Sequence, residues 1–315
     1  MLCTLCTIGA QSQNIGRPER SNPGNLLKNF QTPPKGYGEV PFYWWMGDTL
    51  TREHLLGHLE ILKNKGISSL QVNYAHSDKG GKSWGLTFKS KPEIFTEEWW
   101  DLFGWFMKEA NKRGMTVSLS DYTLGVGQEQ FVDEALAEHP EITGHELRME
   151  KLYAQGKVEW KLAENPLSVV AYKMNADSTL LESSATDLTS KIKDKKLEWN
   201  SPEGIWAIVH VYTIKKDPSY DPMHPLSGKT YVKHFFQKFE DRFPEDSKNG
   251  LNFFFSDELN FQLGNLIWND YFQQEFIKRK GYDIVPRLAA LYEDLGDLTP
   301  KYRLDYNCLL YTSDA

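Results

Sequence analysis

Apolar runs that end abruptly at polar residues recur along this chain. The clearest is Leu251-Asn-Phe-Phe-Phe-Ser-Asp-Glu-Leu-Asn-Phe261, in which Asp257 and Glu258 come almost directly after the apolar residues. A continuous apolar run after a turn signal such as Asn249-Gly250 predicts a strand that is buried on both faces, as strands of parallel sheets are. Three earlier runs also end at polar groups: residues 42–46 before Asp48, residues 68–74 before His76 and Asp78, and residues 115–120 before Asp121 and Tyr122.

Amphipathic helices are predicted between these strands, because apolar residues recur there at helical spacing. Thr51 is the expected cap of the first helix, which ends at Gly66, and Thr96 is the expected cap of the second, which ends at Gly114. Two further apolar faces lie at Val232, Phe235, Phe239 and Phe243 and at Trp268, Phe272 and Phe276. Strands that alternate with helices pair in parallel through right-handed crossovers.

The predicted fold class is α/β, a (β/α)8 TIM-type barrel that is incomplete. Five strands are expected, near residues 42, 68, 115, 205 and 251, and a sixth between Leu288 and Leu295. Eight strands close such a barrel, which takes about 250 residues or more, so the count predicts a chain that is truncated at its C-terminus. Reactive groups of barrel enzymes follow the carboxyl ends of the strands, although a single carboxylate there is often only a helix cap or a loop residue.

A segment that departs from the barrel pattern covers residues 140–204. Short alternating runs at 157–162 and 168–173, separated by polar turns, predict antiparallel strands. We interpret this segment as a β-rich insertion after the third strand, with the first part of the barrel at 41–139 and its continuation at 205–307. A loop rich in Asp, Pro and His follows the resumed strand at residues 217–225, and ordered loops at this face often carry function.

Both ends of the chain call for a separate interpretation. Residues 1–13 resemble the end of a secretory signal peptide without its basic start, and residues 14–40, rich in Pro, Gly and Asn, are expected to be a linker. This predicts a secreted or periplasmic protein. Cys3 and Cys6 would be removed with the peptide, and no stretch reaches the roughly 18 apolar residues of a membrane span. Residues 308–315 resemble a non-native tail.

Composition favours a globular enzyme with a saccharide partner. The formal net charge of −7 and the lack of a basic cluster argue against a nucleic-acid partner. Ten Trp and fifteen Tyr exceed what a core usually needs, so some are expected to bind sugar rings. Trp44 and Trp45, at the end of a predicted strand, are the aromatic side chains proposed to stack on a sugar.

Several motifs together resemble glycoside hydrolase family 106, the α-L-rhamnosidases, and the unclassified barrel enzymes around it. They are Pro41-Phe-Tyr-Trp-Trp-Met-Gly-Asp48 with Leu50-Thr-Arg-Glu-His54, Gly66-Ile-Ser-Ser-Leu-Gln-Val72, Gly114-Met-Thr-Val-Ser-Leu-Ser-Asp121, Phe253-Phe-Phe-Ser-Asp-Glu258, and Phe276-Ile-Lys-Arg-Lys-Gly-Tyr-Asp-Ile284. The likeness extends over residues 41–307. It implies a (β/α)8 barrel, an inverting mechanism with two carboxylates, and a Ca²⁺ ion close to the site.

The resemblance assigns the general acid to Glu258, with Asp257 beside it to favour the protonated form. The family places its Glu a little further past the Asp, where this chain has Leu259-Asn260, so the carry-over departs from the usual pattern. The general base is expected from a later strand, which would leave this fragment inactive. Asp121 is the best substitute within the chain.

Other polar residues at the same strand ends and loops are candidates for hydrogen bonds to sugar hydroxyls. They are Asn73, His76, Asp121, Tyr122, His210, His224 and Asn260. Two other classes of function stay open. One is a metal-dependent barrel hydrolase with His76, His210 and His224 as ligands, which no His-x-His motif supports. The other is a carbohydrate-binding barrel protein without catalysis.

Overall fold

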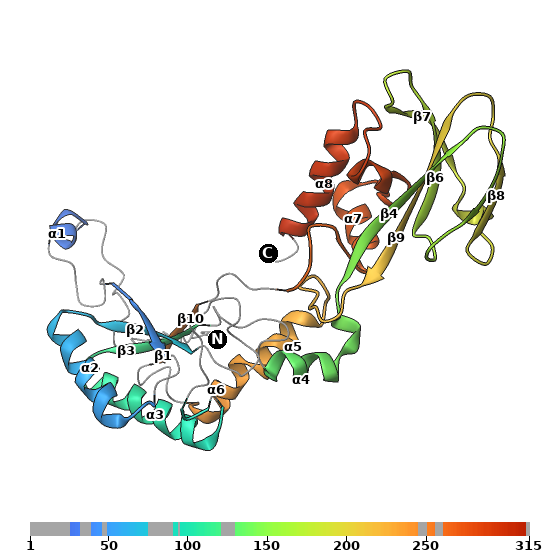
Figure 1. Cartoon of the computed structure of the whole chain (residues 1–315). Coiled ribbons are helices and arrows are strands. Elements are labelled where there is room, and N and C mark those ends of the chain that lie inside the picture. Colours follow the sequence, from blue (N-terminus) through green and yellow to red (C-terminus); the bar gives the residue numbers. More distant parts are fainter. Residues whose placement is uncertain are drawn as a thin grey trace, which may run out of the picture. The chain divides into compact units, whose positions relative to one another are not determined.

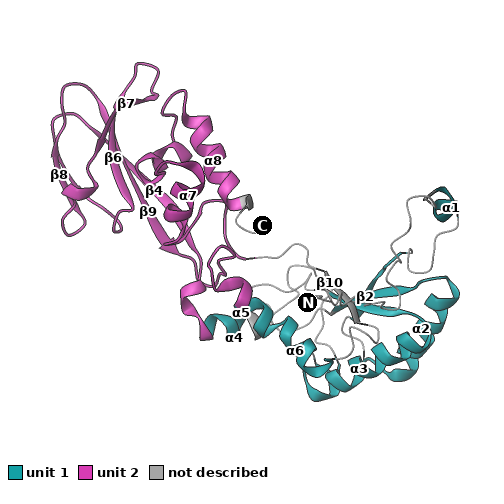
Figure 2. Cartoon of the chain, turned by 180° about the vertical axis from the view of Figure 1, so that it is seen from behind, with its two compact units in different colours: residues 1–137, 230–260 teal, residues 138–229, 261–315 magenta. Residues whose placement is uncertain are grey.

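The computed structural model divides the chain into two compact units. It describes residues 26–31, 39–45, 49–74, 91–93, 95–120, 130–244, 251–255 and 261–312 (Figure 1). Unit 1 comprises residues 1–137 and 230–260, and unit 2 comprises residues 138–229 and 261–315 (Figure 2). Unit 2 therefore interrupts unit 1 in the sequence, and its own two parts are separated by the last strand of unit 1.

Unit 1 contains a parallel sheet of four strands. These are β1 (Phe42–Trp45), β2 (Ser69–Tyr74), β3 (Thr116–Ser120) and β10 (Leu251–Phe255), in the order β1-β2-β3-β10. Helices α2 (Arg52–Asn64) and α3 (Glu97–Lys112) connect the first three strands, and Figure 1 shows both along one face of the sheet. A short helix, α1 (Leu26–Gln31), precedes β1 in the chain.

Both connecting helices begin and end where their sequences predict. The hydroxyl of Thr51 accepts a hydrogen bond from the backbone N–H of His54, and that of Thr96 accepts one from Trp99. These bonds satisfy N–H groups that the first turn of a helix leaves without a partner. Gly66 and Gly114 follow the two helices at φ 84° and 70°, a backbone conformation that glycine adopts without strain.

Aromatic rings fill the core between the sheet and its helices. The ring of Trp45 lies edge-on to Trp99, Phe103 and Phe106 of α3, at centroid distances of 6.1, 6.1 and 5.3 Å. Phe239 of α6 (Phe236–Arg242) lies 4.9 Å from Trp100, so this helix packs beside α3. Two more helices, α4 (Gln130–Glu138) and α5 (Ser227–His234), connect the units along the chain.

The other face of the unit 1 sheet is polar and buried. Leu70 and Val72 alternate with Ser69, Gln71 and Asn73 along β2, and Thr116 and Ser118 continue the polar set on β3; all are at most 3% exposed. The hydroxyl of Thr116 donates to that of Ser69 at 2.8 Å. The strands are therefore amphipathic, with apolar residues toward the helices and hydrogen-bonding residues on the opposite side.

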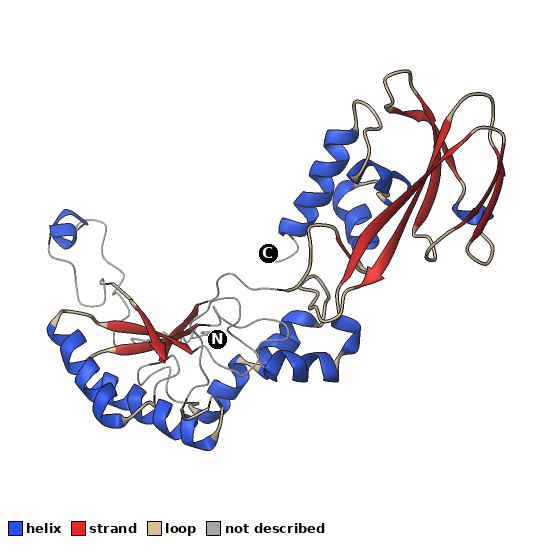
Figure 3. Cartoon of the chain, viewed as in Figure 1, coloured by secondary structure: helices blue, strands red, loops and turns tan. Residues whose placement is uncertain are grey.

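Unit 2 is built on antiparallel strands, drawn as red arrows in the upper right of Figure 3. A five-stranded sheet has the order β11-β4-β9-β6-β7, and β5 and β8 form a second, two-stranded sheet. The strands are β4 (His145–Ala154), β5 (Lys157–Lys161), β6 (Ser168–Met174), β7 (Leu180–Asp187), β8 (Lys196–Asn200), β9 (Trp206–Lys215) and β11 (Ile267–Trp268). Among the described residues of this unit, one 3-10 helix precedes these strands, one lies between them and one follows them: η2 (Pro140–Ile142), η3 (Thr189–Lys191) and η4 (Val285–Leu291).

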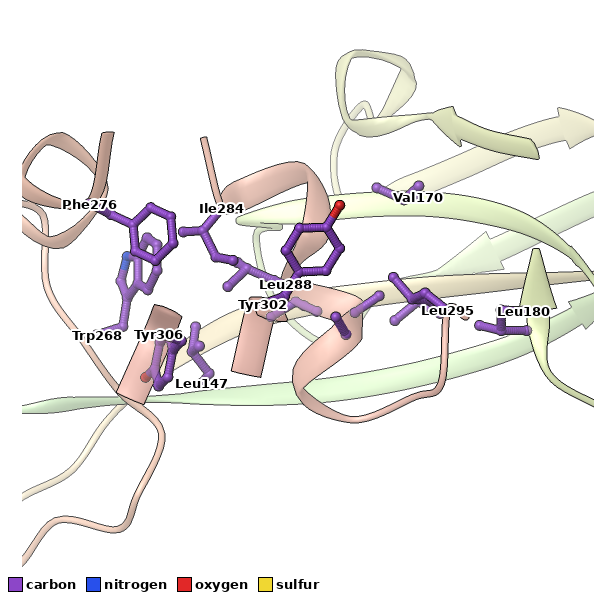
Figure 4. Close-up of a cluster of buried hydrophobic side chains, with 14 of the residues drawn as sticks. Leu147, Val170, Leu180, Trp268, Phe276, Ile284, Leu288, Leu295, Tyr302 and Tyr306 are labelled. Atoms are coloured by element: carbon purple, nitrogen blue, oxygen red, sulfur yellow. The ribbon is translucent and has the colours of Figure 1, made fainter. Parts of the chain in front are cut away.

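The five-stranded sheet buries apolar side chains on both faces. On one face, Ala207, Val209 and Val211 of β9 pack with residues of η4, α7 (Phe272–Lys280) and α8 (Thr299–Thr312). Figure 4 shows this cluster, to which α7, η4 and α8 contribute Phe276, Leu288 and Tyr306. On the other face, Trp206 and Ile208 pack with Leu197 and Trp199 of β8. The sheet is thus the middle of three layers.

Two strand predictions are wrong. The apolar run at 205–212 does not continue a barrel: it forms most of β9, which pairs antiparallel with β4 and β6. The sixth strand expected between Leu288 and Leu295 is absent among the described residues, where η4 covers residues 285–291. A mixed α/β fold with antiparallel strands after β3 is confirmed. The four parallel strands form an open sheet rather than a closed barrel, and an incomplete barrel stays a prediction.

The apolar helical face predicted at residues 232–243 is shared between two helices rather than lying on one. Helix α5 ends at His234 and α6 begins at Phe236, with Phe235 between them at φ −118° and ψ −75°. The predicted end of α7 is confirmed: Gly281 follows Lys280 at φ 77°, and its N–H donates to the carbonyl of Ile277.

Candidate functional site

The carboxyl ends of β3 and β10 lie side by side in unit 1. These strands are parallel neighbours, and Phe255 at the end of β10 is the register partner of Ser120 at the end of β3. Chain segments that leave the two strands therefore start from the same edge of the sheet. Six predicted site residues, His76, Asp121, Tyr122, Asp257, Glu258 and Asn260, lie outside the described residues and remain predictions.

Trp44 and Asn73 are brought together at this edge, but Trp45 is not available to a ligand. Trp44 pairs with Asn73 in the register of β1 and β2, and its side chain is 38% exposed. Asn73 is buried, and its Nδ2 has no hydrogen-bond partner in the described part of the chain. Trp45 is 1% exposed and packs against α3, so the prediction that it stacks on a sugar is corrected: it is a core residue.

His210 occupies the buried centre of unit 2. It lies on β9, and its side chain is fully buried, with Tyr212 stacked at a centroid distance of 4.7 Å. Its Nδ1 lies 3.4 Å from a carboxylate oxygen of Glu150, the register partner on β4. Burial lowers the pKa of His210, and the Glu150 carboxylate opposes this only in part. Its ring packs edge-on with Trp160 of β5 at 5.9 Å, which makes it part of the interior between the two sheets.

A pocket of about 340 Å³ opens at the end of the five-stranded sheet of unit 2, within the range of small-molecule sites. All of its lining residues belong to this unit, and they come from η2 and the start of β4, the end of β9, the loop before α5, and β11 with the residues that precede α7. They are Glu141, Thr143, His145, Thr213, Asp221, His224, Leu226, Trp268, Asn269, Asp270 and Tyr271. His224 is the one predicted site residue in this pocket.

The loop before α5 is held in place by hydrogen bonds to the chain segment that precedes β4. The hydroxyl of Ser219 accepts from the N–H of Gly144 at 2.9 Å, and the N–H of Asp221 donates to the carbonyl of Ile142 at 2.8 Å. A Cβ on Gly144 would lie 2.6 Å from both methyl carbons of Leu263, so the Leu263 side chain would have to move to admit a larger residue. These contacts fix the loop that carries Asp221 and His224.

Asp221 is a buried carboxylate whose oxygens both accept hydrogen bonds. Oδ1 accepts from the N–H of Met223 at 2.9 Å, and Oδ2 accepts from Nδ2 of Asn269 at 2.8 Å. Burial raises the pKa of Asp221, while the bond from Asn269 opposes that rise. A general acid needs a proton on an oxygen that faces its substrate, whereas both oxygens here face N–H donors. The carboxylate is therefore better suited to hold the pocket wall than to transfer a proton.

His224 and Tyr271 form the aromatic side of the pocket. Their rings lie edge to face at a centroid distance of 5.2 Å. Nδ1 of His224 accepts from the N–H of Leu226 at 3.3 Å, so a single ring proton sits on Nε2, which is then a donor. The N–H of Tyr271 donates to Oδ1 of Asn269 at 2.9 Å, and the Tyr271 side chain is 47% exposed.

Most of the pocket could not be predicted from the sequence. The loop at residues 217–225 was singled out for its Asp, Pro and His content, and that signal could have found Asp221 as well as His224. Nothing in the sequence around His145, Asn269 or Tyr271 marks them as site residues, because they meet only through the pairing of β4 with β9 and β11.

Among the described residues, no three His, Cys, Asp or Glu side chains converge as a metal site. His210 and His224 lie in different parts of unit 2, the first between the two sheets and the second in the pocket on the helical side of the larger sheet. The alternative in which they bind one metal ion together is therefore wrong. No helix in the described ranges is long and apolar enough to cross a membrane.

Comparison with known proteins finds a family model and a solved structure that the chain resembles. Residues 145–299 match the family model of the alpha-L-rhamnosidases, glycoside hydrolase family 106. The chain also resembles the solved structure of a rhamnosidase from Novosphingobium sp. PP1Y, with a TM-score of 0.58 and 13% sequence identity. That likeness, which concerns the fold, covers 91% of this chain and 45% of the other. No curated protein matches the chain in a sequence search.

The match over residues 145–299 supports the resemblance to glycoside hydrolase family 106 that the sequence motifs indicate. The matched segment includes most of unit 2 and the strand β10 of unit 1.

Proposed function

We propose that the protein containing this chain hydrolyses terminal sugar linkages in polysaccharide, with an α-L-rhamnosyl group at the cleaved bond. The family match supports this substrate class. The observation that carries the proposal is the pairing of β3 with β10 as parallel neighbours, because the candidate carboxylates follow directly from these two strand ends. Parallel α/β sheets bind their ligands outside the carboxyl ends of the strands.

The proposed mechanism is inverting and uses two carboxyl groups. Glu258, kept protonated by the charge of Asp257, gives its proton to the glycosidic oxygen as the bond to the sugar breaks. A second carboxylate takes a proton from a water molecule, which attacks the anomeric carbon from the opposite face. The two groups stand about 6.5–9.5 Å apart in such enzymes, so the adjacent Asp257 and Glu258 cannot fill both roles.

Asp121 is the base that this chain offers. Adjacent strands lie about 4.8 Å apart, so carboxylates that follow neighbouring strand ends can reach the separation that an attacking water needs. Trp44 and Asn73, on the same sheet, would then contact the sugar by stacking and by the unpaired amide Nδ2. A base from another part of a longer protein is the alternative.

Calcium is an expectation from the family resemblance alone. Ca²⁺ binds six to eight oxygen ligands, usually with several carboxylates among them. The described residues do not form such a cluster, and each proton transfer proposed above uses only the carboxylates of this chain. A carbohydrate-binding protein without catalysis is the second candidate, favoured by a pocket in unit 2 whose buried carboxylate, Asp221, has both oxygens bonded to N–H donors.

The test is the release of free sugar from a panel of aryl glycosides that includes an α-L-rhamnoside, with the natural protein, Glu258→Gln and a control, Glu240→Gln. Glu240 is an exposed carboxylate of α6. Release of rhamnose that is lost in Glu258→Gln and retained in Glu240→Gln is the expected result. Turnover that survives Glu258→Gln would place the acid elsewhere. Sugar binding without turnover in the natural protein would favour the second candidate.

A further inference from the structure

We propose that the pocket of unit 2 binds one neutral sugar ring, in addition to the strand-edge site proposed for hydrolysis. The pocket is complete within unit 2, since every lining residue belongs to that unit. Its volume of about 340 Å³ lies near the lower end of small-molecule sites, which range from about 300 to 1,000 Å³. This space suits a single pyranose ring with a few waters rather than a longer oligosaccharide.

The charges around the pocket argue for a neutral ligand. Its lining contains Glu141, Asp221 and Asp270 but no Lys or Arg, which disfavours a phosphate or a uronic acid. Two of these carboxylates already have partners: Asp221 accepts two hydrogen bonds, and Glu141 lies 3.0 Å from Nδ1 of His139. Hydrogen bonding, including that to His139, lowers the pKa of Glu141. Hydrogen bonds therefore already engage both oxygens of Asp221 and one oxygen of Glu141, which a cation would otherwise bind.

Tyr271 supplies an aromatic face that is already oriented. Its backbone N–H is fixed by Asn269, and its ring packs on the ring of His224, while almost half of the side chain is exposed. Trp268, the register partner of His145, closes the wall beside it and is buried. A flat aromatic ring matches the C–H face of a sugar, and a ring that is held in advance loses little entropy on binding.

Hydrogen-bonding groups with complementary roles surround this aromatic face. Nε2 of His224 is a donor in the neutral tautomer, Asp270 is an exposed acceptor, and the hydroxyl of Thr213 can do both. His145 and Thr213 are half-buried at the pocket wall. A mixture of donors and acceptors beside an exposed ring fits the hydroxyl groups and the C–H face of one sugar.

The experiment is hydrogen-exchange mass spectrometry with titration calorimetry, using L-rhamnose as the probe and D-glucosamine and D-glucuronate as charged comparisons. The natural protein is compared with Tyr271→Ala and Thr213→Val. Tyr153→Ala is the control, because Tyr153 is 56% exposed in the same unit and does not line the pocket. L-Rhamnose is expected to slow exchange in residues 141–146 and 267–272, and both pocket variants are expected to weaken binding there about tenfold.

Several outcomes would overturn this inference: no protection of these two segments, protection that survives both pocket variants, equal loss in Tyr153→Ala, or tighter binding of glucosamine or glucuronate. Protection at residues 251–258 reports on the strand-edge site instead. Glu258→Gln separates the two proposals when its hydrogen exchange is measured beside its turnover of aryl glycosides. Loss of turnover tests the proposal of hydrolysis, whereas protection of residues 141–146 and 267–272 tests this pocket.

Discussion

Replacement of Asn269 by Asp tests whether the bond between Asn269 and Asp221 holds the pocket together. The variant exchanges the amide nitrogen, 2.8 Å from Oδ2 of Asp221, for a second carboxylate oxygen, and both side chains are buried. Two charges at this distance repel by about 6 kcal/mol at an effective dielectric constant of about 20. Binding a proton costs less, so the pair is expected to share one proton at neutral pH.

The expected loss of stability follows from that proton. Protonating an acid with an ordinary pKa of about 3.9 at pH 7 costs about 1.36 kcal/mol for each unit of difference, or about 4 kcal/mol. Because the pair holds its proton more tightly when folded, its pKa is raised on folding. The variant Asn269→Asp should therefore regain stability as the pH falls. The difference between its free energy of unfolding and that of the natural protein should come close to zero near pH 4.

Asn269→Ala gives the contrasting result. It removes a bond to a charged acceptor, worth about 1.5–3 kcal/mol, without adding a charge. The natural protein and both variants are to be unfolded in urea at pH 7 and pH 4.5 and followed by near-ultraviolet circular dichroism. Asn307→Asp, at an exposed position of α8, is the control. A difference between Asn269→Asp and the natural protein that does not change with pH would refute the reasoning, as would equal stability at pH 7.

Three further changes have definite expected outcomes. Gly144→Ala should lower the free energy of unfolding by about 1–3 kcal/mol, measured in urea, because the new Cβ meets the methyl groups of Leu263 at 2.6 Å. Glu146→Gln should lower the free energy of unfolding by about 1.5–3 kcal/mol at neutral pH. Burial alone would raise the pKa of Glu146, but its hydrogen bonds more than offset this effect and lower the pKa. The difference in stability between the variant and the natural protein should therefore fade as the pH drops through the folded pKa. Trp45→Ala should cost about 3–5 kcal/mol by thermal unfolding, whereas Trp44→Ala should cost far less and act mainly on sugar binding.

Local features of the fold were predictable because they depend on residues close together in the sequence. The caps at Thr51 and Thr96 need only a side-chain oxygen and an N–H three residues further on. The parallel strands β1, β2 and β3 follow from apolar runs separated by amphipathic helices.

The strand β9 shows why the rest could not be predicted. Its buried residues, such as Ile208 and Val209, are apolar on both faces, which is typical of a parallel strand in a barrel. Here the same pattern arises in an antiparallel sheet, because helices cover one face and the β5-β8 sheet covers the other. The pattern of apolar residues indicates that both faces of the strand are covered, but it does not show which elements cover them.

The same limit applies to Trp45 and to the pocket. An aromatic residue at a strand end can face a ligand or a helix, and only the register of β1 settles that Trp44 pairs with Asn73 while Trp45 packs on α3. The pocket residues lie in three segments that are 42 or more positions apart, so their meeting depends on tertiary pairing, which no local pattern records.

Unit 1 is not continuous in the sequence, and this affects how its sheet forms during synthesis of the chain. About 130 residues separate the end of β3 from the start of β10, its neighbour in the sheet. At about 5–20 residues per second, a ribosome takes roughly 6–26 seconds to produce them. During that time one edge of β3 lacks its final partner, and open strand edges invite association between chains. Slower translation between residues 121 and 250 should therefore increase aggregation of the nascent protein, and chaperones that shield strand edges should relieve it.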